Sequence, residues 1–175
     1  LKHLATPEVN VCTIEDPIEM VEPSFNQMQV HHNIDLSFAD GVRALLRQDP
    51  DIIMVGEIRD LETAEMAIQA ALTGHLVIST LHTNDAPSAV TRLLELGVAP
   101  YLIKATVLGV MAQRLVRTLC NSCKKQGDPD PDGWKVLTSP WKIKMPARMY
   151  HPVGCLDCCD TGYMGRQGCS ELVRM

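Results

Sequence analysis

Three short runs of β-branched and aliphatic residues constrain the fold of this 175-residue chain more than any other feature. They read VNVCTIED at 9–16, IIMVGE at 52–57 and HLVISTLH at 75–82. Short apolar runs separated by stretches with helical periodicity are typical of parallel α/β sheets. Ligands of such sheets bind at the carboxyl ends of the strands. The sequence therefore predicts an α/β fold with four polar residues along one sheet edge: Glu15, Asp16, Glu57 and His82.

Helices are expected between these strands. Ser37 caps a predicted helix that runs to Asp49, because the following Pro50 restricts Asp49 to extended geometry. Asp60 caps a second predicted helix over 61–73, and Gly74 fits the left-handed residue that ends it.

The sequence pattern of the remainder of the chain predicts two further helices and an appendage. The helices are expected at 87–96 and 100–118, and residues 1–4 are interpreted as the end of a helix. From 124 to 153 the chain has five prolines and little periodicity, which predicts an irregular segment. We expect one domain over 1–119 and a smaller one over 120–175.

Charge and hydropathy argue against several classes of function. The formal net charge is −5, so there is no overall basic character of the kind that binds nucleic acid. No apolar run approaches the roughly 18 residues of a membrane span, and no signal peptide is visible. We expect a cytoplasmic protein that does not insert into the membrane.

The acidic residues at the strand ends suit phosphate chemistry. Phosphoryl transfer from a nucleotide needs Mg²⁺ on the phosphates and a group that orients the attacking water. Glu57 is a candidate for Mg²⁺, and Glu15 and Asp16 are candidates for the base. From the residue pattern alone, helix caps or solvated turn residues explain these carboxylates equally well.

Several arginines and histidines are candidates for nucleotide contacts. Arg43 and Arg47 are four residues apart and share a helical face, while Arg59 and Arg92 are expected beside the strand-end region. Surface ion pairs are the alternative for each arginine.

His75 and His82 bracket one predicted strand. A strand rises about 3.3 Å per residue, so seven steps separate them by roughly 23 Å and they cannot ligate one metal. His82, at the carboxyl end, is the better candidate for contacting phosphate. His75 is expected to contact a partner or another surface, and a structural hydrogen bond remains the alternative for both.

Four of the seven cysteines form two C-x-x-C pairs. Cys120 and Cys123 make the first pair, and Cys155 and Cys158 make the second. Two such pairs supply the four thiolates of a tetrahedral Zn²⁺ site, so the sequence predicts structural zinc, with free thiols as the alternative.

No glycine in the chain is followed by lysine. The phosphate-binding loop G-x-x-x-x-G-K-[ST] is therefore missing, and without it a nucleotide is held poorly. We expect the chain by itself to be inactive as an ATPase.

Four motifs resemble the hexameric secretion ATPases that drive type II secretion and type IV pilus assembly. They are IEDPIE at 14–19, RQDPDIIMVGEIRDLETAEMA at 47–67, TGHLVISTLHTNDA at 73–86 and AQRLVRTLC at 112–120. The resemblance covers nearly the whole chain, with the motifs in family order. It implies a partial RecA-like core of a P-loop NTPase, with the phosphate loop before residue 1 and a small zinc-binding tetracysteine appendage.

The resemblance also implies residue roles. Glu15 matches the catalytic carboxylate of the family's Asp box, with Asp16 beside it, and Glu57 matches the Walker B acid near Mg²⁺. His75 and His82 match the two His-box histidines. The arginines implied at subunit contacts and nucleotide sites are Arg43, Arg47 and Arg92.

ATP, Mg²⁺ and Zn²⁺ are the ligands that this resemblance implies. The implied partners are identical subunits of a hexamer and platform proteins of the inner membrane, to whose cytoplasmic face the protein is expected to bind peripherally. The tetracysteine set favours an assembly or export motor over a retraction motor. The alternatives are a non-enzymatic interaction module stabilised by zinc and, less well supported by charge, a zinc ribbon that binds nucleic acid.

Overall fold

The chain forms two compact units in a computed structural model that describes residues 1–141 and 143–175. The first unit holds Leu1–Ala112 and Glu171–Met175, and the second holds Gln113–Ser170. No helix among the described residues combines the length and the apolar character needed to span a membrane.

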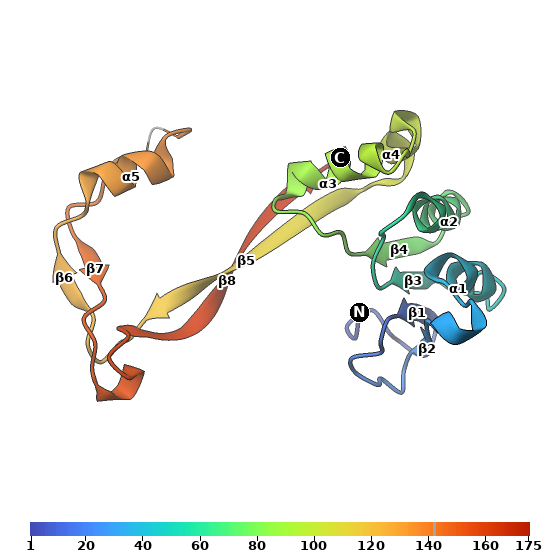
Figure 1. Ribbon diagram of the computed structural model, residues 1–175, viewed down its shortest axis with the longest axis horizontal. Helices are drawn as coiled ribbons and strands as arrows, with labels where there is room; N and C mark the ends of the chain where they lie inside the picture. The colour runs from blue at the N-terminus through green and yellow to red at the C-terminus, as the bar shows by residue number, and fades with distance from the viewer. Residues whose placement is uncertain (142) are drawn as a thin grey trace. The chain divides into compact units, whose positions relative to one another are not determined.

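A four-stranded sheet forms the centre of the first unit (Figure 1). Its order is β2-β1-β3-β4, and every neighbouring pair is parallel. The strands are β1 (Val11–Glu15), β2 (Asn26–Gln29), β3 (Ile52–Val55) and β4 (Leu76–Ser79). The predicted α/β class and parallel sheet are confirmed. The strands are shorter than the predicted runs, so Asp16, Glu57 and His82 lie just beyond strand ends.

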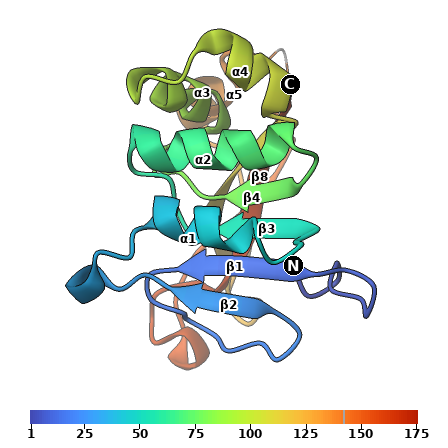
Figure 2. The same cartoon turned by 90° about the vertical axis from the view of Figure 1, so that its right-hand side faces the viewer.

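Two helices cover one face of this sheet (Figure 2). They are α1 (Phe38–Leu45) and α2 (Leu61–Leu72). Alternate residues of the strands pack against them because side chains along a strand point to opposite faces. The resulting buried cluster combines strand residues with α1 residues and includes Cys12, Ile14, Ile53, Val55, Phe38, Val42 and Leu45.

Capping residues fix where α1 and α2 begin. Ser37 and Asp40 form a reciprocal capping box at α1. The side chain of Asp60 accepts from the backbone N–H of Thr63 at the start of α2. Gly74, with φ of 103°, lies just after the α2 C-cap, as predicted. Helix α1 is shorter than expected and ends at Leu45. The expected extended geometry at Asp49 is wrong, because its φ of 51° is left-handed.

Two more helices complete the first unit. They are α3 (Ala86–Glu95), which Asp85 caps, and α4 (Pro100–Thr106). Together with α2 they bury a second apolar cluster of Ala64, Ile68, Leu93, Val98 and Ile103. A short 3-10 helix, η1 (His32–Ile34), precedes α1. Residues 2–4 form a turn, so the expected helix end at 1–4 is wrong.

The expected helix over 100–118 is also wrong beyond Thr106. The strand β5 (Gly109–Leu119) follows α4 and pairs with β8 (Tyr163–Arg174). Leu108 O accepts from Met175 N, and Gly162 O accepts from Cys120 N, so the strands run antiparallel. A Cβ at Gly109 would lie 3.1 Å from Val173 O. Pairing with a distant segment therefore overrides the local helical pattern.

The second unit is built from short elements. They are β6 (Lys125–Gly127), α5 (Pro131–Thr138), β7 (Met149–His151) and the 3-10 helix η2 (Leu156–Cys158). β6 and β7 pair antiparallel. The segment at 124–153 thus has more regular structure than expected, although α5 buries none of its side chains.

Candidate functional site

The carboxyl edge of the parallel sheet gathers the predicted acidic residues. Glu15 is the last residue of β1, and Glu57 follows β3 by two residues. The register pairs Ile14 with Val55 and Val55 with Ser79, so the ends of β1, β3 and β4 are level. Because all strands point the same way, residues after their carboxyl ends share one edge.

Glu57 is the most enclosed carboxylate of this edge. Its side chain is 12% exposed. Arg59 Nη2 lies 2.5 Å from Oε1, and His82 Nε2 lies 3.0 Å from Oε2. Donation from Arg59 lowers the pKa of Glu57; burial acts to raise it, and His82 adds to the lowering. Glu57 is therefore ionised at neutral pH, and an ionised carboxylate only accepts, so the His82 ring donates to it.

Backbone contacts fix the position of Glu57. Thr80 Oγ1 donates to Gly56 O at 2.7 Å, and Ile58 N donates to Thr80 O at 3.1 Å. A Cβ at Gly56 would lie 3.1 Å from Ile14 O and 3.3 Å from the Phe38 ring. This crowding is a physical reason for glycine directly before Glu57.

Glu15 is held by neighbours on β1 and β2. Thr13 Oγ1 donates to Glu15 Oε1 at 2.6 Å, and Gln27 Nε2 donates to the same oxygen at 3.0 Å. Thr13 is 1% exposed. Asp16 is the next residue, and its Oδ2 lies 3.3 Å from Nε2 of His32.

His75 lies at the other end of β4. Its Nδ1 is 2.9 Å from Ala70 O and 3.0 Å from Thr73 Oγ1, at the end of α2. The structure therefore places His82, but not His75, beside Glu57. Within this chain His75 makes structural hydrogen bonds, which are the alternative to a contact with a partner or another surface.

Among the described residues, the three predicted arginines make no ion pair with the carboxylates at the sheet edge. Arg43 pairs with Asp40 and Glu62, and Arg92 pairs with Glu95. Arg47 is exposed. Their proposed contacts with nucleotide or with other subunits stay predictions.

Sequence reasoning missed three of the residues that hold the two glutamates. The sequence places Arg59 only near a strand end, and it predicts no contact of Thr13 or Gln27 with Glu15. Thr13 shares a strand face with Glu15, which the period of two indicates. Gln27 becomes a neighbour only through the pairing of β1 with β2, which the sequence does not show.

The four predicted zinc ligands converge in the second unit. The sulfur atoms of Cys120, Cys123, Cys155 and Cys158 all lie within 4.8 Å of one another. Three pairs are 3.9, 3.8 and 3.7 Å apart. Zn–S bonds of about 2.3 Å in a tetrahedron require sulfur separations of about 3.8 Å.

Backbone amides surround these sulfurs. Gly154 N donates to Cys123 at 3.4 Å, and Cys155 N and Gly162 N donate to Cys158 at 3.3 and 3.2 Å. Burial acts to raise the pKa of Cys158, but the amides of Cys155 and Gly162, together with the Cys155 and Cys123 side chains, lower it to about 7. The donor set and spacing fit a Zn²⁺ ion.

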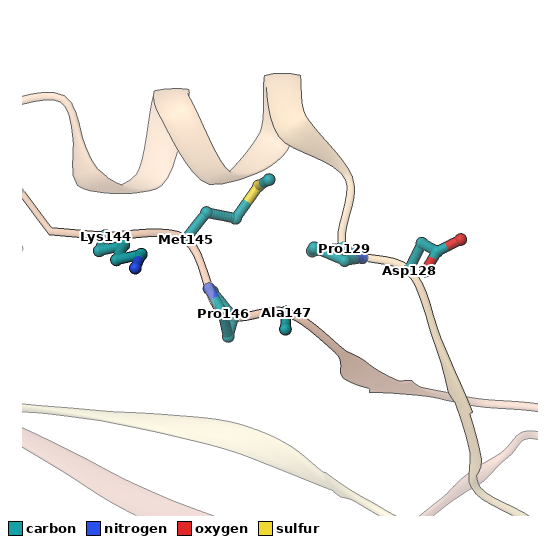
Figure 3. Close-up of a pocket in the computed structure, with 6 residues that line it drawn as sticks. All are labelled: Asp128, Pro129, Lys144, Met145, Pro146 and Ala147. Atoms are coloured by element: carbon teal, nitrogen blue, oxygen red, sulfur yellow. The ribbon is translucent and has the colours of Figure 1, made fainter.

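A hollow of about 680 Å³ also lies in the second unit (Figure 3). Its lining consists of Asp128, Pro129, Lys144, Met145, Pro146 and Ala147. It contains no residue of the carboxylate site, and no function is assigned to it.

The fold and site together define an α/β protein with an acidic, histidine-containing site at the carboxyl ends of parallel strands. Residues 1–175 match the Type II/IV secretion system protein family. The chain belongs to this family.

The names of individual relatives agree with this family. The chain is 67% identical over its full length to the type IV pilus assembly ATPase TfpB of Acinetobacter baylyi, covering 30% of that protein. It is 53% identical over 99% of its length to the type II secretion system ATPase E of Vibrio cholerae, covering 34% of it. It thus spans about a third of the length of these curated relatives.

A solved structure is also similar. The pilus retraction motor PilT with bound ADP superposes with a TM-score of 0.61 and is 39% identical. The match covers 69% of this chain and 38% of that one.

Proposed function

We propose that the full-length protein hydrolyses ATP and powers type II protein secretion or type IV pilus assembly. Relatives of both kinds are named ATPases and align with essentially the whole chain. The observation that carries the proposal is the position of Glu15 and Glu57 at the level carboxyl ends of adjacent strands. Because the chain has no Gly-Lys pair, turnover is proposed for the full-length protein rather than for this chain by itself.

The proposed roles follow from the contacts. Glu15, held through Oε1, would orient the attacking water and accept its proton. Glu57, ionised between Arg59 and His82, would bind Mg²⁺ on the nucleotide phosphates, whose charge the metal neutralises. His82 would hold Glu57 and approach the phosphates, and Asp16 lies at the same edge. For His75, Arg43, Arg47 and Arg92 we propose contacts made in the assembled protein, because in this chain they lie apart from Glu15 and Glu57.

The proposed architecture is a partial RecA-like core over 1–119 and a zinc-binding subdomain over 120–175. Zn²⁺ would be held by Cys120, Cys123, Cys155 and Cys158, and three of their sulfur separations are close to the tetrahedral value. The proposed assembly is a homohexamer at the cytoplasmic face of the inner membrane, in contact with platform proteins.

Substituting each glutamate in the full-length protein tests the catalytic proposal. Loss of a general base costs about 10² to 10⁴ in rate, so Glu15→Gln should lower kcat by that amount. Glu57→Gln should also nearly abolish turnover. Phosphate release at saturating ATP and Mg²⁺ is the measurement.

Glu65→Gln is the matched control, because Glu65 is exposed on α2 and outside the site. It should leave kcat unchanged. Normal hydrolysis by Glu57→Gln with an intact fold would overturn the assignment and favour a non-enzymatic module.

A further inference from the structure

Two glutamines of β2 lie on the same face of the sheet as Glu15. Gln27 is the register partner of Thr13, and Gln29 is the partner of Glu15. Residues two apart on a strand project from one face, so all four side chains share it. Across this face Gln27 is the diagonal neighbour of Glu15, within reach of a long side chain.

The amide of Gln27 makes three hydrogen bonds. Its Nε2 donates to Glu15 Oε1 at 3.0 Å and to Met20 O at 3.1 Å. Its Oε1 accepts from Glu22 N at 2.7 Å. Both amide hydrogens and the amide oxygen are therefore engaged, which fixes the orientation of the group.

These bonds leave one oxygen of Glu15 available. Oε1 accepts from both Thr13 and Gln27. In residues 1–141 and 143–175, no protein group donates to Oε2 within hydrogen-bond distance. The contacts of Gln27 and Thr13 therefore distinguish the two oxygens: Oε1 is held, and Oε2 stays open to another donor.

The loop at 16–25 is tied to the same amide. Met20 and Glu22 belong to this loop, in which the residues Met20 and Val21 are 61% and 80% exposed. A displacement of the loop would pull on the Gln27 amide through Met20 O and Glu22 N. The same amide would then lose its alignment with Glu15 Oε1.

We propose that Gln27 is a positioning residue that orients Glu15 and ties that orientation to the loop at 16–25. The proposal rests on the proposed catalytic role of Glu15. A misplacement of about 1 Å at a reacting group costs on the order of a hundredfold in rate, so this single amide has a measurable effect.

Gln29 provides a matched control on the same strand and face. Its Oε1 accepts from Ile18 N at 3.3 Å, so it also holds the loop. Its side chain makes no hydrogen bond to the Glu15 carboxylate, whose two protein donors in the described chain are Thr13 and Gln27. Gln27→Leu and Gln29→Leu therefore separate an effect on Glu15 from a general effect on the loop.

The experiment measures ATP hydrolysis by the full-length protein over a range of pH. Gln27→Leu should lower kcat by about tenfold to a hundredfold, with KM little changed, because the lost bond acts on the chemical step. Gln29→Leu should keep kcat near the wild-type value.

Gln27→Glu gives a signature that a purely structural role would not. It keeps the acceptor for Glu22 N but puts a second carboxylate beside Glu15. A neighbouring like charge raises a carboxyl pKa, so the acid limb of the kcat profile should move to higher pH. This isosteric variant also keeps the test open if Gln27→Leu fails to fold.

The outcomes separate the two proposals. Wild-type kcat in Glu15→Gln would overturn the catalytic role itself, whatever Gln27 does. Loss of activity in Glu15→Gln together with unchanged kcat and pH profile in both Gln27 variants would overturn the positioning role alone. Equal losses from Gln27→Leu and Gln29→Leu would also overturn it.

In the Glu15→Gln background, Gln27→Leu should cause no further loss of kcat, since both substitutions act through one carboxylate.

Discussion

One carboxylate oxygen of Glu57 contacts the Arg59 guanidinium, and the other accepts from the His82 ring. The contribution of Glu57 to stability therefore depends on pH. Its folded pKa is lowered from the ordinary 4.5, chiefly by donation from Arg59. A group whose folded pKa is lowered stabilises the fold above its ordinary pKa, and this stabilisation is lost as the pH falls through the folded pKa.

Arg59→Gln should therefore lower the melting temperature at neutral pH and have little effect in acid. Above pH 4.5 the wild-type protein keeps the extra stability of the pair, and the variant lacks it. Below the lowered pKa of Glu57 the two melting temperatures should converge. Thermal unfolding between pH 3 and pH 8 measures both limits.

Arg47→Gln is the control, because Arg47 is exposed. Its melting temperature should follow the wild-type curve at each pH. A constant offset between Arg59→Gln and the wild type at all pH values would contradict the role assigned to the ion pair.

At the scale of single elements, the N-caps are where the sequence specifies the structure most directly. Asp60 Oδ1 accepts from Thr63 N at 2.8 Å, and Oδ2 accepts from Thr63 Oγ1 at 3.2 Å. Helix α2 contributes Ala70 to the buried cluster of the sheet and packs against α1 and β4 as well as against α4. Its first turn therefore matters to both apolar clusters.

Asp60→Ala should lower the free energy of unfolding by about 1 kcal/mol, the typical cost of a lost N-cap. Asp60→Asn keeps an oxygen acceptor at the same position and should cost much less. Urea denaturation of both variants gives the comparison. An equal loss in the two would mean that the negative charge, rather than the cap hydrogen bond, stabilises the helix.

The predictable elements are those whose signals are local. Ser37, Asp60 and Gly74 mark helix ends through bonds made within a few residues, and the β-branched runs form the parallel strands. Strand β5 was missed because its partner β8 lies some 45 to 65 residues further along the chain. The candidate site shows the same difference between local and distant signals. Glu15 and Glu57 are predictable from the strand pattern, whereas the role of Gln27 depends on pairing between strands.

At the scale of the whole molecule, the two units differ in what stabilises them. The first has two apolar clusters built from strands and helices. In the second, the buried hydrophobic side chains of the described residues are Cys120 and Cys158. A unit of this size without an aliphatic core usually needs disulfides or a metal to fold. All the cysteines are free thiols, so the proposed Zn²⁺ would supply the missing stability.

Chelation should therefore unfold residues 113–170 selectively. Protein purified without chelator should contain about one zinc per chain, as two C-x-x-C pairs supply one tetrahedral site. After treatment with a strong chelator, hydrogen exchange should accelerate at β6, β7 and η2. Amides of β1, β3 and α2 should stay protected, because their core contains no cysteine ligand.

Cys155→Ser should reproduce the effect of chelation, since it removes one of four ligands. Cys169→Ser should keep both the zinc and the exchange pattern, because Cys169 is exposed and outside the cluster. Slow exchange throughout the second unit after complete removal of zinc would show that the metal does not stabilise it. Disulfides in place of metal would overturn the ligand assignment, because oxidised cysteines have no thiolates to offer Zn²⁺.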